Sequence, residues 1–169
     1  MKNQVIGILL LMVLLGTTSC NKDEGLTSEE LLEWNKKIAE AYVHSYAVSI
    51  GEAVEDMADE TTIINYIRRA IDPISFYPDS SGYFYVYDFE CVNIAHARQK
   101  DLEGQNLYDY TDTRGKYVIR ELSAKAQSGG GYVEFYWIKP GDSGEKRKLG
   151  YVEPIPNTSY FIGTGVYLE

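Results

Sequence analysis

Three tyrosines, Tyr83, Tyr85 and Tyr87, occupy alternate positions in the stretch GYFYVYDFECVNIAHARQ. Because the side chains of a β-strand alternate between its two faces, all three phenols are expected on one face. Aligned hydroxyl groups can donate to a carboxylate while their rings form apolar walls. The alternation therefore predicts a polar ligand site, with Tyr85 and Tyr87 as its candidate contacts. The alternative is that these rings only pack.

A bound carboxylate also needs a positive or hydrogen-bonding partner, because an unpaired buried charge is costly. Four side chains are candidates for this role: His96, Arg98, Lys139 and Lys148. His96 is expected at the end of a strand, and near neutral pH it can donate or accept a hydrogen bond. The alternatives are a core or loop-anchoring role for His96 and a solvated hairpin position for Lys148.

The adjacent residues Tyr136 and Trp137 point to opposite faces of a predicted strand, so only one can line a pocket. We retain both as candidates. Catalysis is disfavoured, because the chain has 2 histidines, and the first, His44, has no cysteine or carboxylate at metal-ligand spacing. The second, His96, stands five residues after Cys91, but a nucleophilic pair would need a chance geometry and nothing acidifies the thiol. The glycines of SGGGYV precede a strand rather than a helix, which argues against a phosphate-binding loop. We therefore expect no enzymatic activity, no metal site and no cofactor.

Helical periodicity dominates the first half of the domain that must position these residues. Thr27 or Ser28 can cap a helix of roughly 30 residues. Its apolar stripe is expected to face a partner surface and comprises Leu31, Trp34, Ile38, Ala41, Tyr42, Ser45, Val48, Ala53 and Met57. A second, short helix over residues 61–72 should end before Pro73, which cannot continue the hydrogen-bond ladder.

From Tyr83 onward the apolar period changes to that of strands. The pattern predicts a hairpin from residues 83–89 and 92–96, a helical insertion between Arg98 and Ala126, and three further strands at 132–139, 147–153 and 160–168. The apolar side of the inserted helix comprises Val118, Ile119, Leu122 and Ala126. With 169 residues, 44% of them hydrophobic, the chain suits one α+β domain.

The N-terminus predicts a secretory signal peptide rather than a membrane span. Lys2 precedes an apolar run over residues 5–15, shorter than the roughly 20 residues that a transmembrane helix needs. Cys20 directly follows small residues, at the place where bacterial lipoproteins are cut and acylated. We therefore predict a signal peptide at residues 1–19, a lipidated Cys20 and a tether over residues 20–26. The alternative is a plain secreted protein.

Charge and cysteine content limit the partners. Removing residues 1–19 reduces the 16 Lys and Arg by one, to 15, against 25 Asp and Glu, which gives a net charge of about −10. Such a surface repels polyanions, so nucleic-acid binding is not expected. With Cys20 acylated, Cys91 is the remaining thiol and is expected to be a small buried residue. The segment CNKDE resembles a surface-export tag, which predicts an outer-membrane or cell-surface location.

Five ordered blocks carry a family likeness: GYFYVYDFECVNIAH, LEGQNLYD, GKYVIRE, GGGYVEFYW and KLGYVEPIPNTSYFIGTGVY. Over residues 27–169 they resemble the single Cache (sCache) domains, which sense small molecules outside bacterial cells. The resemblance implies a PAS-like, five-stranded antiparallel sheet. A long N-terminal helix would cover one face and a helical cap the other, with the ligand under the cap. It also points to Lys148, His96 and Trp137 as site residues.

The chain departs from this family pattern in the first hairpin. Cys91 stands where relatives usually have glycine, and Ala97 stands where they have proline after the histidine. The sequence stops at Glu169, where most relatives continue into a membrane helix and a signalling module, so output through another protein is expected. The combined expectation is a lipid-anchored sensor of a small organic acid, facing outside the cytoplasm and reporting to an unknown signalling or transport partner. The alternative is a ligand-free adaptor built on a Cache fold.

Overall fold

The long N-terminal helix begins where its sequence supplies a cap. In the computed structural model, which describes residues 25–168, α1 spans Ser28–Val54. Thr27 and Glu30 form the predicted capping box: the backbone N–H of Glu30 donates to Thr27 Oγ1 (3.2 Å), and that of Thr27 donates to the Glu30 carboxylate (2.8 Å). None of the helices within the described range is long and apolar enough to cross a bilayer.

A second helix follows after a short turn. Helix α2 spans Glu60–Ile71, with Asp59 accepting a hydrogen bond from the N–H of Thr62 at its start. It ends two residues before Pro73, as the missing N–H of proline predicts.

The strands form one antiparallel sheet in the order β2-β1-β5-β4-β3. Their bounds are β1 Tyr85–Asp88, β2 Asn93–His96, β3 Gly131–Ile138, β4 Glu145–Pro154 and β5 Tyr160–Tyr167. Helix α3, Val118–Gln127, and a single 3₁₀ turn, η1 at Lys100–Leu102, lie in the connection between β2 and β3. The predicted α+β, PAS-like fold with a five-stranded sheet is confirmed.

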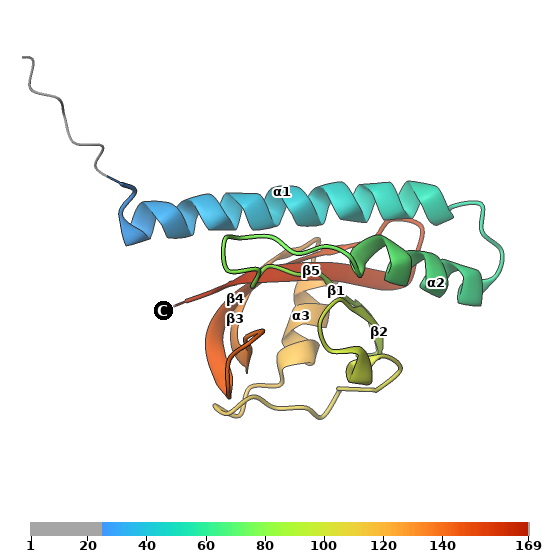
Figure 1. Cartoon of the computed structure of the whole chain (residues 1–169). Coiled ribbons are helices and arrows are strands. Elements are labelled where there is room, and N and C mark those ends of the chain that lie inside the picture. The colour runs from blue at the N-terminus through green and yellow to red at the C-terminus, as the bar shows by residue number, and fades with distance from the viewer. Residues whose placement is uncertain (1–24, 169) are drawn as a thin grey trace, which may run out of the picture.

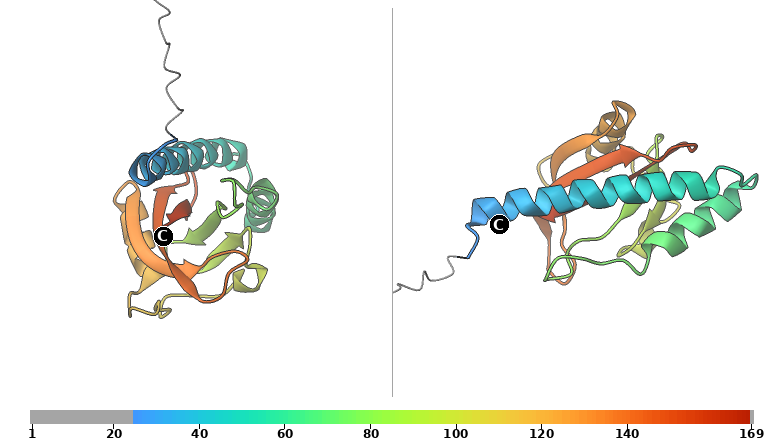
Figure 2. Two further views of the ribbon diagram at one scale, coloured as in Figure 1. Left: turned by 60° about the vertical axis from the view of Figure 1, so that its left-hand side comes forward. Right: turned by 90° about the horizontal axis from the view of Figure 1, so that it is seen from above.

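The helices cover opposite faces of this sheet. Helix α1 packs along β4 and β5, α2 packs against β2, and α3 packs against β3 and β4. Figure 1 shows α1 running across one side of the sheet and α3 on the other, and the left view in Figure 2 shows the curved sheet beneath α1. The sheet therefore separates two buried clusters.

Alternation along β1 assigns its residues to these two clusters. Phe84 and Val86 pack beneath α1 and α2. Tyr83, Tyr85 and Tyr87 pack in the cluster that includes the buried side of α3. The prediction that the three phenols share one face is therefore confirmed.

The larger residues of the predicted apolar stripe of α1 do not lie against the sheet. Trp34 is 59% exposed, and Leu31, Tyr42 and Val48 are also exposed. The buried side instead consists mainly of small and β-branched residues, namely Ala39, Val43, Ala47, Ile50, Gly51 and Val54. A Cβ at Gly51 would lie 2.8 Å from Pro156 O, so small side chains allow the helix to approach the sheet closely.

The helical insertion is shorter than the sequence pattern suggests. Outside η1 and α3, the connection between residues 98 and 126 contains turns and bridges. Arg120 anchors part of this connection, because its guanidinium lies 3.8 Å from the ring centres of both Tyr108 and Tyr117. All four predicted apolar residues of α3 are buried.

Candidate ligand-binding site

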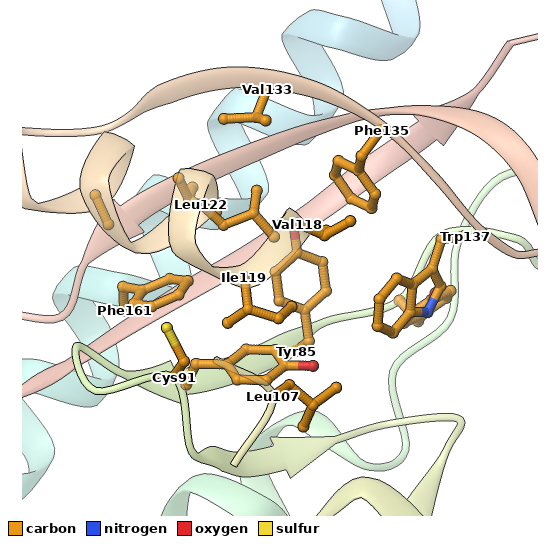
Figure 3. Close-up of a cluster of buried hydrophobic side chains, with 14 of the residues drawn as sticks. Tyr85, Cys91, Leu107, Val118, Ile119, Leu122, Val133, Phe135, Trp137 and Phe161 are labelled. Carbon is orange, nitrogen blue, oxygen red and sulfur yellow. The ribbon is translucent and has the colours of Figure 1, made fainter. Parts of the chain in front are cut away.

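A small hollow lies in the core between the sheet and α3. Its lining comprises Tyr83, Tyr85, Tyr87, His96, Val118, Ile119, Leu122, Phe135, Trp137 and Lys148. The hollow measures about 10 Å³, which is about the space that one water molecule needs. Figure 3 shows Tyr85 of β1, Ile119 of α3 and Trp137 of β3 directed toward the same region.

Lys148 places a positive charge in this hollow. It lies on β4, is 1% exposed, and forms no ion pair with any carboxylate among residues 25–168. Its Nζ instead faces aromatic rings, at 4.0 Å from the ring centre of Tyr83, 4.7 Å from Tyr167 and 5.6 Å from Tyr85. Burial lowers the pKa of Lys148 to about 7. This environment disfavours the charged amine unless an anion joins it.

His96, at the end of β2, supplies a neutral donor. The backbone N–H groups of Arg98 (3.3 Å) and Gln99 (2.9 Å) both donate to His96 Nδ1. Burial, followed by the positive charge of Lys148, lowers the pKa of His96 to about 3. The ring is therefore neutral at physiological pH, and because Nδ1 accepts, Nε2 carries the proton. That N–H can donate to a carboxylate oxygen.

The phenols also remain protonated donors. Burial raises the pKa of Tyr83 and of Tyr85 well above the usual value. Tyr83 Oη lies 3.2 Å from Tyr167 Oη, and the Tyr85 hydroxyl donates to Thr164 O at 3.3 Å, a long bond that a better acceptor can replace. The Tyr87 hydroxyl is buried with no hydrogen-bond partner among the described residues.

Two strand glycines make space for the Tyr85 ring. A Cβ at Gly163 would lie 2.6 Å from a Tyr85 ring carbon, and a Cβ at Gly150 would lie 2.6 Å from Phe135 and 3.0 Å from Tyr85 Oη. Gly163 is also the register partner of Tyr85 on β5. The ring therefore lies against bare backbone, which explains why glycine occupies strand interiors here.

Trp137 forms one wall of the hollow and is held in place by Gln99. Its Nε1–H donates to Gln99 Oε1 at 2.8 Å, so the indole N–H already has a partner. The backbone N–H of the same glutamine donates to His96 Nδ1. Gln99 therefore orients both the aromatic wall and the histidine donor.

The structure brings together five of the seven predicted contacts: Tyr85, Tyr87, His96, Trp137 and Lys148 all line the hollow. Arg98 and Tyr136 do not line it, and their placement corrects the predicted site. The Arg98 guanidinium donates to the carbonyls of Ala97 (3.0 Å) and Ile74 (3.3 Å) and is exposed. Tyr136 points away from Trp137, beneath the guanidinium of Arg114 at 5.1 Å.

Five residues that line the hollow were not among the predicted ligand contacts: Tyr83, Val118, Ile119, Leu122 and Phe135. Their signals were present, since Tyr83 continues the alternation of β1 and Phe135 stands two residues before Trp137 on the same face. The remaining three belong to the predicted apolar side of α3.

Of the two unusual residues of the first hairpin, Ala97 fits the backbone and Cys91 occupies a position that favours glycine. Cys91 has φ 71°, in the left-handed region that favours glycine, and its side chain is buried as predicted. The backbone N–H of Ala97 donates to Phe84 O at 3.1 Å, a hydrogen bond that proline could not form. This bond fixes the chain directly after His96.

Comparison with known proteins assigns this fold and site to a family. A family model described as a Cache domain matches residues 12–169. The chain belongs to the Cache domain family. Cache domains are extracytoplasmic sensory domains that bind small molecules rather than catalyse reactions.

Curated Cache relatives are larger signalling receptors. The chain is 32% identical over 169 residues to the sensor histidine kinase MctS of Rhizobium johnstonii, covering 98% of this chain and 36% of the kinase. It is 33% identical over 92 residues to the methyl-accepting chemotaxis protein McpP of Pseudomonas putida, covering 54% of this chain and 17% of that protein. The chain thus spans only about a third, or less, of these relatives.

Two solved structures share the fold over most of this chain. A methyl-accepting chemotaxis protein of Vibrio parahaemolyticus matches with a TM-score of 0.72 and 33% identity, covering 83% of this chain and 93% of that one. A Cache chemosensory domain solved to explain carboxylic acid recognition matches with a TM-score of 0.72 and 25% identity, covering 85% of this chain and 100% of that one.

Proposed function

We propose that this Cache domain senses a short carboxylate, which binds in the hollow beneath α3. One observation carries the proposal: Lys148 is a buried cation with no carboxylate partner among residues 25–168. A ligand carboxylate provides the missing charge, and His96 Nε2–H and the Tyr85 hydroxyl provide neutral donors beside it. The related domain solved for carboxylic acid recognition supports the same ligand class.

The remaining walls limit the rest of the ligand. Val118, Ile119 and Leu122 of α3 and Phe135 of β3 are apolar, so they favour a short aliphatic tail. A hollow of about 10 Å³ cannot hold even a two-carbon acid without movement. Binding therefore requires α3 and its flanking loops to shift outward and close again around the ligand, which selects one arrangement of the cap over another.

The location and output of the protein are part of the same proposal. The signal peptide at residues 1–19 and the lipidated Cys20 lie outside the described residues, and the sequence pattern alone supports them. They would anchor the domain at the outer membrane or cell surface, facing outside the cytoplasm. Ligand binding would then be reported through α1 to a partner protein. A Cys20→Ser variant should lose both fatty-acid labelling and recovery in the membrane fraction; unchanged labelling would refute the anchor.

A thermal-shift titration tests the ligand class. Acetate, propionate and butyrate are compared with the matching neutral amides, which have the same shape without the charge. At a hundredfold excess over Kd an acid should stabilise the fold by about 2.7 kcal/mol, which raises the Tm by about 8 °C for a domain of this size. The amides should give no shift.

Two outcomes contradict the proposal. Equal shifts from acids and amides would mean that Lys148 does not recognise the ligand charge. No shift from any short carboxylate at millimolar concentration would favour the ligand-free adaptor, in which the Cache fold serves only as an interaction surface. Turnover of the acid during incubation would indicate an enzyme instead.

A further inference from the structure

Three buried polar atoms of two neighbouring side chains near the hollow have no hydrogen-bond partner outside this pair among the described residues. They are the hydroxyl of Tyr87 and both side-chain amide atoms of Asn93, Oδ1 and Nδ2. Asn93 is 0% exposed and Tyr87 is 1% exposed. Buried polar groups are nearly always paired, because leaving one unpaired costs the full desolvation of that group. A cluster of three is therefore a place where a partner is expected.

An irregularity in the β1–β2 ladder places these two side chains together. The register pairs Tyr85 with His96 and Val86 with Ala95, and then shifts so that Tyr87 pairs with Asn93. The shift sends Ile94 into the cluster beneath α1 and α2. Asn93 consequently stands opposite Tyr87, a residue that lines the hollow.

The backbone N–H and carbonyl of Asn93 both form hydrogen bonds, so only its side-chain amide still needs partners. Its backbone N–H donates to Gln105 O at 2.9 Å, and its backbone carbonyl accepts from the N–H of Gly104 at 2.8 Å. Even if the Tyr87 hydroxyl and the Asn93 amide bond to each other, one amide group and further lone pairs remain unused.

Among the described residues Lys148 has cation–π contacts with Tyr83, Tyr85 and Tyr167 but not with Tyr87, so we place this polar pair at the end of the hollow away from the cation. Lys148 Nζ is 4.0 Å from the ring centre of Tyr83 and 5.6 Å from that of Tyr85. The Tyr85 and Tyr87 ring centres are a further 6.0 Å apart. Burial raises the pKa of the Tyr87 hydroxyl, and the neighbouring side chains that also shift this pKa, Asn93, Tyr83, Tyr110 and Cys91, include no cation. The far end therefore suits an uncharged group of the ligand, because it offers no positive charge to neutralise a second carboxylate.

We propose that the ligand carries a second, uncharged hydrogen-bonding group, a hydroxyl or oxo group separated from the carboxylate by a few carbons, and that Tyr87 and Asn93 recognise it. This inference rests on the proposed function, because it assumes that the carboxylate lies at Lys148. The amide of Asn93 donates to and accepts from the group, and the Tyr87 hydroxyl supplies a further donor or acceptor. An unsubstituted fatty acid would leave these three atoms with no partner beyond each other.

Calorimetric titration of matched pairs tests the inference. The pairs are lactate with propionate, 3-hydroxybutyrate with butyrate, and 4-hydroxybutyrate with butyrate. In the wild-type protein at least one hydroxy acid should bind about tenfold more tightly than its parent, the effect of one to two well-placed hydrogen bonds. Asn93→Leu should abolish this preference while keeping the Kd of the parent acid within about threefold. Asn65→Leu, on the exposed side of α2, should leave the preference intact.

A stability measurement separates this role from a structural one. Because Asn93→Leu removes two buried polar atoms that have no partner beyond Tyr87, the ligand-free variant should keep or raise its Tm. A fall of several degrees would mean that the amide makes a structural hydrogen bond and would overturn the inference. If Asn93→Leu does not fold, Tyr87→Phe gives the same affinity test with a smaller change.

The remaining outcomes are distinguishable. Equal affinity for hydroxy and parent acids in the wild type overturns this inference and leaves the proposed function standing. A preference that survives both Asn93→Leu and Tyr87→Phe places recognition elsewhere and also overturns it. Absence of binding by every acid overturns the proposed function and this inference together.

Discussion

Replacing Lys148 by methionine should make the ligand-free domain more stable while removing carboxylate binding. Burial lowers the pKa of this lysine from 10.5 to about 7, which amounts to about 5 kcal/mol against the charged form at 1.36 kcal/mol per unit. The cation–π contact with Tyr83 at 4.0 Å offsets up to about 2 kcal/mol. About 3 kcal/mol remains, within the range of 1–4 kcal/mol gained when buried charges are replaced by well-packed apolar residues.

The pH dependence of this gain follows from the two pKa values. Below pH 7 the lysine is charged in both the folded and the unfolded state, so the folded protein carries the full desolvation cost. Between pH 7 and 10.5 the unfolded chain holds the proton and the folded protein does not, so raising the pH stabilises the wild type. The variant lacks this gain. Its advantage of about 3 kcal/mol at pH 6 should therefore fall to about 2 kcal/mol at pH 9, which is the cost of keeping the lysine deprotonated 1.5 pH units below its unfolded pKa of 10.5.

Urea unfolding of wild type and Lys148→Met at pH 6 and pH 9 measures both quantities. Lys146→Met is the control, because Lys146 is an exposed lysine of the same strand and its loss should change stability by less than about 0.5 kcal/mol. A Lys148→Met variant that is less stable than wild type at pH 6 would refute the reasoning. So would a stability difference that stays constant between the two pH values, or a variant that butyrate still stabilises.

Two further predictions follow from the site. Because the pKa of His96 is lowered to about 3, the unfolded chain takes up a proton below pH 6.5 that the folded protein does not, and stability should fall by about 1.4 kcal/mol per pH unit on acidification. His96→Asn should flatten this part of the pH profile in urea titrations; an unchanged slope would contradict the assignment. Gly163→Ala should displace the Tyr85 ring, because its Cβ would lie 2.6 Å from a ring carbon, and should cost about 1–3 kcal/mol. An alanine variant with wild-type stability and carboxylate affinity would show that the ring is not confined there.

Period-2 patterning predicted much of the site because strand geometry leaves little freedom. Once Tyr85 faces the hollow, alternation and register also place His96 and Lys148 on the same side of the sheet. The pattern likewise separated Trp137 from Tyr136. It could not decide which of these two faces was enclosed, because that depends on where α3 lies, and the position of α3 follows from long-range packing.

Loop and helix residues were harder to place. Arg98 follows the end of β2, where alternation no longer applies, and its guanidinium bonds to backbone carbonyls instead of entering the hollow. On α1 the larger apolar residues of the predicted stripe, such as Trp34, lie on the exposed side rather than on the side that packs against the sheet. The buried side uses Ala39 and Ala47 because a helix lying close to a sheet has no room for large side chains. Gln99 carried no sequence signal, since a lone polar loop residue reveals nothing of its partners.

The polar pair at the far end of the hollow depends on a feature that period-2 patterning cannot show. A regular ladder would pair Tyr87 with Ile94 rather than Asn93, and the shift after Val86 reverses this. Bulges of this kind follow from the competition between neighbouring turns and side-chain packing. The sequence indicates that Asn93 lies in a strand but not which face it joins.

Only one layer of strands stands between the ligand hollow and the longest helix. On β1, Tyr85 borders the hollow while its immediate neighbours Phe84 and Val86 are embedded on the opposite side. On β5, Phe161 and Ile162 divide in the same way, and β5 packs directly against α1. A strand pushed by an occupant on one side must disturb side chains on the other within a single residue. A displacement caused by ligand binding therefore has to cross only the thickness of one polypeptide backbone to reach the side chains that pack against α1.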